Sequence, residues 1–120
     1  MFGLTNDIHY YLYQGDVDMR KGINGLYKLV KNEMHKVPIS GDAYIFFSRN
    51  RRMVKILKWD GDGFILYYKK LERGTFERLR YNADRRCFNM PWRDFVMMMQ
   101  GASLEHIRYR SRFEIRDLSI

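Results

Sequence analysis

The most constraining feature of this chain is a strand–turn–strand pattern over residues 53–72. Two runs rich in β-branched and aromatic residues, 53–59 and 64–72, flank an Asp-Gly-Asp-Gly turn at 60–63. Glycine adopts positive φ without steric cost, so this turn favours an antiparallel hairpin. Its length fixes the register and places Trp59 opposite Phe64. The same register predicts the pairs Leu57 with Leu66, Lys55 with Tyr68, Lys58 with Ile65, Ile56 with Tyr67 and Val54 with Lys69.

A helix is predicted over residues 18–37, where apolar residues recur at steps of three and four and form one face. Asp18 is the expected N-cap. Gly22 and Gly25 each weaken a helix by about 1 kcal/mol relative to alanine. Either they mark a close approach to another element or the helix begins later. The apolar face comprises Met19, Ile23, Leu26, Val30, Met34 and Val37.

Together the elements predict an α+β domain over residues 1–100. Its sheet is small and mostly antiparallel, with about four strands around the hairpin, and one or two helices pack on one face. Trp59, Phe64 and Leu66 are expected in the core. The segment 101–120 alternates charged and apolar residues and is predicted as a strand or a loose arm. The other predicted elements are a β-prone run at 10–18 that ends in turn residues, strands at 43–48 and 75–82, and a short helix at 91–101.

The positive charge of the chain is concentrated in its middle. The formal net charge is +8, and residues 49–93 carry 13 basic and 5 acidic side chains, whereas residues 1–42 and 94–120 are each neutral overall. A cationic block on a well-formed core favours a polyanionic partner. The alternative is that the charge only maintains solubility.

The predicted hairpin brings the cations of 49–52 and 69–73 together at its open end. Arginine binds phosphates through its bidentate fork and lysine as a point charge, so a phosphate backbone would supply the missing counter-charge. Tyr67 and Tyr68 could stack on bases if they are exposed. The alternative is a sheet edge that basic residues protect from aggregation. The predicted nucleic-acid-binding residues are Arg20, Lys21, Arg49, Arg51, Arg52, Lys55, Lys69, Lys70 and Arg73.

Residues suited to a metal site or to catalysis are sparse. The three histidines are scattered and Cys87 is the only cysteine, so we expect no zinc site, no cofactor and no internal disulfide. Asp60 and Asp62 hint at a calcium loop, but its twelfth position is Leu71 instead of glutamate. No apolar run is long enough to cross a bilayer, and we expect a cytoplasmic protein that is not an enzyme.

Three blocks of sequence resemble the accessory protein of the IS sixty-six family of bacterial insertion sequences, the TnpB-type product of its second open reading frame. The blocks are "VDMRKGINGL" (17–26), "FSRNRRMVKILKWDGDGF" (47–64) and "LYYKKLERGTF" (66–76). The resemblance covers residues 2–100 and implies a protein that assists a separate transposase. Many relatives have Trp-Pro after the third block, where this chain has Glu77-Arg78-Leu79.

These lines of reasoning predict a non-catalytic accessory protein of transposition. We expect it to bind DNA mainly through phosphate contacts and to have the transposase as a candidate partner. Two alternatives stay open. In one, the basic hairpin docks an acidic surface of the transposase without contacting DNA. In the other, the chain is a metal-dependent nuclease that uses Asp60 and Asp62.

Overall fold

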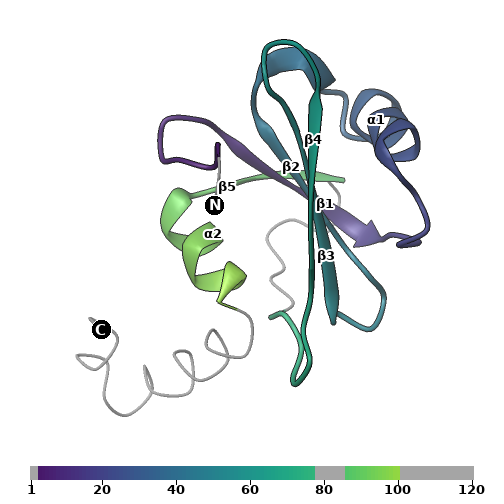
Figure 1. Cartoon of the computed structure of the whole chain (residues 1–120), viewed down its shortest axis with the longest axis vertical. Helices are drawn as coiled ribbons and strands as arrows, with labels where there is room; N and C mark the ends of the chain where they lie inside the picture. Colours follow the sequence, from purple (N-terminus) through teal and green to yellow (C-terminus); the bar gives the residue numbers. More distant parts are fainter. Residues whose placement is uncertain (1–2, 78–85, 101–120) are drawn as a thin grey trace.

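A five-stranded sheet in the order β4-β3-β2-β1-β5 forms the centre of the protein (Figure 1). The structure, a computed structural model, describes residues 3–77 and 86–100. β1 and β2 pair in parallel, and the remaining neighbours are antiparallel, so the predicted mostly antiparallel α+β fold is confirmed. The strands are β1 (Tyr10–Asp16), β2 (Ala43–Phe47), β3 (Met53–Trp59), β4 (Phe64–Lys70) and β5 (Cys87–Met90).

The hairpin of β3 and β4 has the predicted register in all six predicted pairs, from Val54 opposite Lys69 to Trp59 opposite Phe64, and it continues to Met53 opposite Lys70. The sequence did not reveal β5, a four-residue strand that pairs with β1. Residues 75–77 form no strand, and the rest of the strand predicted at 75–82 lies outside the described residues. The predicted arm at 101–120 also lies outside them.

The parallel pair β1 and β2 is joined by a crossover that contains helix α1 (Ile23–Asn32) and the short 3₁₀ helix η1 (Pro38–Ser40). The predicted start at Asp18 is wrong, because Gly22 occupies the N-cap position. The alternative of a later start is therefore the correct one. Val37, predicted on the buried face, lies beyond the helix and is 61% exposed.

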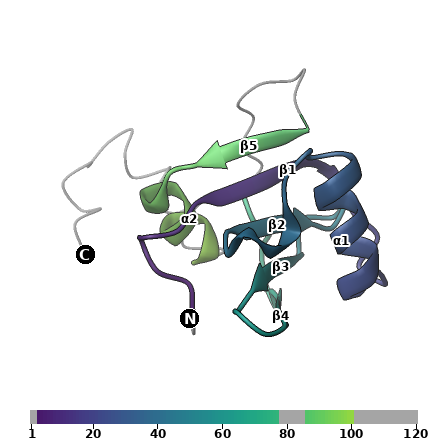
Figure 2. The ribbon, with the colours of Figure 1, turned by 90° about the horizontal axis from the view of Figure 1, so that it is seen from above.

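Each face of the sheet is covered by its own helix (Figure 2). Leu26 and Val30 of α1 pack with Tyr44 and Phe46 on one face. On the other face, helix α2 (Trp92–Met99) packs its residues Phe95, Met98 and Met99 against Ile45, Phe47 and Ile56. The prediction that the helices share one face is therefore wrong. All five residues of β2 are buried, and a strand that is apolar on both sides needs cover on both.

We expect the protein to unfold in alkali, because several of its tyrosines are buried. Burial raises the pKa of Tyr44 to about 12 from its ordinary value of 10, and it also raises the pKa of Tyr10, Tyr13 and Tyr67. The unfolded chain therefore loses the hydroxyl protons of these tyrosines at a lower pH than the folded protein does. For Tyr44, the contribution to the free energy of unfolding is fully present below pH 10 and is lost as the pH rises towards 12. Unfolding followed by circular dichroism should track tyrosinate absorbance, and Tyr44→Phe should show a shallower pH dependence.

Candidate nucleic-acid interface

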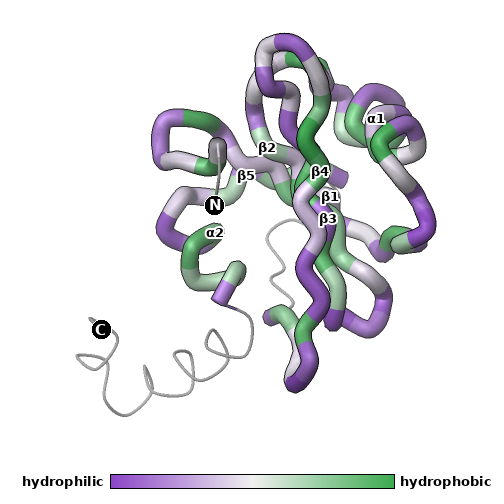
Figure 3. Tube along the Cα trace, viewed as in Figure 1, coloured by the Kyte–Doolittle hydropathy of each residue, from purple (hydrophilic) through white to green (hydrophobic). Residues whose placement is uncertain are grey.

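Two of the basic stretches meet at one end of the sheet. The turn between β2 and β3 and the segment after β4 lie together at the bottom of Figure 1, and both are largely hydrophilic in Figure 3. The Leu71 amide donates to the Arg52 carbonyl at 2.8 Å, and the Phe76 amide donates to the Arg51 carbonyl at 2.6 Å. These backbone bonds confirm that the hairpin brings the cationic segments 49–52 and 69–73 side by side.

The turn between β2 and β3 is held by its own polar side chains. Ser48 Oγ donates to Asn50 Oδ1 at 2.7 Å, and the Arg52 amide donates to the same oxygen at 3.0 Å. Arg51 has a left-handed φ of 61°, which residues other than glycine rarely adopt. The turn therefore has a defined shape, and it leaves Arg49 exposed to solvent.

Arg51 and Arg52 brace this turn against the segment after β4. The Arg51 guanidinium lies over the Phe47 ring, 4.0 Å from its centroid, and Arg51 Nη2 donates to the Glu77 carbonyl at 2.9 Å. Arg52 Nη2 donates to the Glu72 carbonyl at 2.8 Å. A carbonyl oxygen carries no net charge, so Arg52 remains cationic towards solvent while it holds the two segments together.

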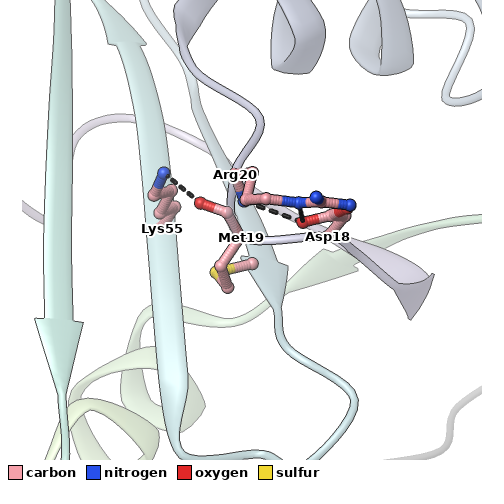
Figure 4. A network of polar contacts seen from close by, with 4 residues as sticks. All are labelled: Asp18, Met19, Arg20 and Lys55. Carbon is pink, nitrogen blue, oxygen red and sulfur yellow. Dashed lines mark hydrogen bonds and ion pairs between the residues drawn. The ribbon is translucent and has the colours of Figure 1, made fainter.

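Lys55 fastens the loop that precedes α1 to the sheet. Its side chain is buried on the α1 face, where Nζ donates to the Met19 carbonyl at 2.7 Å (Figure 4) and to the Lys21 carbonyl at 2.9 Å. The same ammonium lies 5.1 Å from the centroid of the Tyr68 ring. Lys55 is thus enclosed by the protein, and what it does here is fix the position of residues 18–21.

Arg20 and Asp18 form an exposed ion pair in that loop (Figure 4). Arg20 Nη2 lies 2.6 Å from Asp18 Oδ2, and the Arg20 side chain remains 91% exposed. The hydrogen bonds from Arg20 lower the pKa of Asp18 to about 2. Asp18 therefore caps its own loop instead of the helix, since its Oδ1 also accepts from the Arg20 amide at 2.9 Å.

An open hollow of about 780 Å³ lies between this loop, the turn after β2 and the end of β4. Tyr68 lines it and is 55% exposed. Tyr67 points to the opposite face, where it packs against the core cluster under α2. Only Tyr68 of the two tyrosines therefore offers its ring on the cationic side. The lining consists of Asp18, Met19, Arg20, Ser48, Arg49, Asn50, Met53 and Tyr68.

Of the five remaining predicted residues, Lys21 is exposed in the loop before α1, and the other four differ in their contacts. Arg49, Lys70 and Arg73 are exposed, and none forms a hydrogen bond or ion pair with another described residue. Lys69 points to the α2 face, where its Nζ donates to the Met99 carbonyl at 2.7 Å. The sequence predicts that these cations lie at one end of the sheet, but it does not show which of them form hydrogen bonds within the protein.

The model of the family described as "IS66 Orf2 like protein" matches residues 8–109. The chain belongs to this family. Membership connects the chain with the insertion sequences after which this family is described.

Two curated relatives of this IS66 Orf2-like protein come from Sinorhizobium fredii, and their names describe them as uncharacterized. Protein y4jC is 34% identical over 76 residues, which cover 63% of this chain and 65% of the relative. Protein y4hO is 30% identical over 70 residues, covering 58% and 61%. The match therefore spans less than two thirds of either relative. No solved structure matches the chain significantly.

The three sequence blocks that carry the resemblance of this IS66 Orf2-like protein meet at the hollow. Met19 of the first block, Met53 of the second and Tyr68 of the third line it. Lys55, also of the second block, lies beside Met19 and Tyr68. It contacts Met19 through a hydrogen bond and Tyr68 through the aromatic ring. Motifs far apart in the sequence thus build one local structure, which makes this end of the sheet the candidate site.

The rest of the described chain offers little that suits a metal. Within residues 3–77 and 86–100, no three His, Cys, Asp or Glu side chains gather where they could hold an ion. Asp60 and Asp62 lie in the turn at the opposite end of the hairpin from the cations. None of the helices in the described chain is both long and apolar enough to pass through a membrane.

Proposed function

We propose that this protein is a non-catalytic accessory factor of transposition that binds DNA phosphates at the cationic end of its sheet. The observation that carries the proposal is the exposure of Arg49, Lys70 and Arg73 at this end of the sheet, beside a turn that is held by hydrogen bonds. Each of these side chains has neither hydrogen bond nor ion pair to another described residue. Phosphate oxygens are the counter-charge that such a group of cations accepts best.

The other basic residues have supporting roles in this proposal. Arg52 and Lys69 keep their full charge, because their partners are carbonyl oxygens. Arg20 and Lys21 extend the positive surface along the loop before α1, although Asp18 partly offsets Arg20. Arg51 and Lys55 act through position, since one braces the turn and the other fastens the loop. Catalysis is left to the separate transposase.

The proposal is tested by titrating a labelled DNA duplex at rising salt with two variants of equal charge. The triple variant Arg49→Gln, Lys70→Gln, Arg73→Gln removes three cations of the proposed surface. The control Lys28→Gln, Lys31→Gln, Arg93→Gln removes three exposed cations from α1 and α2. The slope of log K against log salt is negative, and each lost phosphate contact makes it shallower by about 0.9. The slope of the first variant should therefore be shallower than that of the wild type by about 2.7, and the slope of the control should be almost unchanged.

Two results would contradict DNA binding at this surface. One is the absence of duplex binding by the wild-type protein even at low salt. The other is an equal loss of slope in both variants, which would mean that net charge alone matters. A complex with the transposase that survives nuclease treatment but is lost in the first variant would instead support protein docking by the same cations.

A further inference from the structure

Tyr68 is an aromatic ring held in place on a cationic surface. Its hydroxyl donates to Met53 Sδ at 3.1 Å, and the buried ammonium of Lys55 lies 5.1 Å from its ring centroid. Both partners belong to β3, the strand that pairs with β4, so the ring is supported from the sheet. With 55% of its surface exposed, the ring still offers a face to a ligand.

The hollow beside Tyr68 has the size and chemistry of a site for a planar aromatic group. Its volume of about 780 Å³ falls within the range of roughly 300–1,000 Å³ that is usual for small-ligand sites. Met19 and Met53 contribute flexible apolar side chains, and methionine sulfur packs well against aromatic rings. Arg20 and Arg49 lie at the same hollow, so a flat apolar group bound there would have cations beside it.

A nucleotide of a single strand combines these two features, a planar base and flanking phosphates. In a duplex the base faces are stacked on each other, and a protein ring on the surface does not reach them. Rings that stack on bases beside a basic groove are the usual means of binding single strands. The polar groups at the hollow are largely engaged already, Asp18 with Arg20 and Asn50 with Ser48 and Arg52, so little base selectivity follows.

We propose that this hollow binds an unpaired nucleotide of a single-stranded nucleic acid, with its base stacked on Tyr68 and its phosphates near Arg20 and Arg49. This inference rests on the proposed function, because it uses the same cationic surface. It adds that duplex and single strand are held differently: a duplex by phosphate contacts alone, and a single strand by phosphate contacts together with the Tyr68 ring.

The test compares a labelled single strand with a duplex of the same sequence, using the wild type, Tyr68→Ala, Tyr68→Phe and Tyr11→Ala. Tyr11 is a matched control, because it is also part-exposed, has the Lys36 ammonium 4.3 Å from its ring centroid and lines a different hollow. Tyr68→Ala should lower single-strand affinity about 5- to 150-fold and leave duplex affinity unchanged. Tyr68→Phe and Tyr11→Ala should bind both as the wild type does.

A direct readout accompanies the affinities. An oligonucleotide carrying iodouracil should cross-link to Tyr68 under light, and mass spectrometry locates the cross-linked residue. The same experiment with a DNA strand and with an RNA strand shows which of the two is preferred. Unchanged single-strand binding by Tyr68→Ala, or an equal loss for duplex and single strand, overturns this inference while the salt-dependent duplex binding stands. Failure of the wild type to bind either form overturns the proposed function itself.

Discussion

Replacement of Lys55 by methionine is expected to lower the free energy of unfolding by about 2–4 kcal/mol. The variant keeps most of the apolar stem but removes the ammonium that donates to the carbonyls of Met19 and Lys21. Hydrogen bonds from a charged group are stronger than neutral ones, and the two carbonyls lose a buried donor. Urea denaturation followed by the fluorescence of Trp59 and Trp92 measures the loss.

Lys58→Met is the matched control for this prediction. Lys58 lies on the same strand and is buried to a similar degree, 8% exposed against 9% for Lys55. Among the described residues, however, its Nζ donates only to the neighbouring Trp59 carbonyl at 3.2 Å, and it lies 4.0 Å from the exposed Asp60. Such contacts contribute little, so this variant should cost less than about 1 kcal/mol.

A second measurement locates the effect of Lys55. Amide hydrogen exchange should accelerate over residues 18–22 in Lys55→Met and remain slow in the centre of β2. Equal destabilisation by Lys55→Met and Lys58→Met would contradict the fastening of this loop by Lys55. It would mean that the two carbonyl bonds of the Lys55 ammonium contribute no more than the single bond of the Lys58 ammonium.

The sequence predicts the hairpin well because two independent constraints agree there. A four-residue Asp-Gly-Asp-Gly turn fixes which residues face each other, and the β-prone runs on both sides have matching length. Helix α1 is predicted by its apolar period but not at its start. Gly22 and Gly25 signalled the later start, while the bonds from Lys55 that hold residues 18–21 in a loop are tertiary contacts without a local signal.

The two-sided cover of the sheet and the fifth strand were harder to predict. The run Ala43–Phe47 has no polar alternation, and its pattern alone fits a strand buried on both sides, but it does not say which helix covers which face. β5 has only four residues, which is too short for a period to show. Sequence patterns are weakest for short edge strands because their pairing depends on contacts from far along the chain.

The candidate site was predicted in outline, and its internal organisation was not. Alternation along β4 places Tyr68 and Lys70 on one face of the sheet and Lys69 on the other. The sequence alone therefore indicates which of these residues share a face. The left-handed backbone of Arg51 has no such signal, because arginine is not a residue that usually adopts positive φ. The inward position of the Arg51 side chain therefore depends on its contacts with the Phe47 ring and the Glu77 carbonyl.

Truncation of either aromatic residue at the end of β2 is expected to cost about 3–5 kcal/mol. Phe46 and Phe47 are each 0% exposed, one in the cluster under α1 and the other in the cluster under α2. In a sheet with a single covered face, one of these neighbours would face solvent and its replacement would cost little. Phe46→Ala and Phe47→Ala should therefore lower the free energy of unfolding by similar amounts, as measured by urea denaturation. A loss below about 1 kcal/mol for either variant would contradict a core on both sides of the sheet.

Phe47 should differ from Phe46 in its coupling to the arginine-rich turn. The Arg51 guanidinium lies 4.0 Å from the Phe47 ring centroid, and an arginine over an aromatic ring contributes about 0.5–2 kcal/mol. A double-mutant cycle of Phe47→Leu with Arg51→Met should show a coupling of that size, whereas the cycle of Phe46→Leu with Arg51→Met should show almost none. Equal coupling in the two cycles would mean that the ring of Phe47 does not hold this arginine.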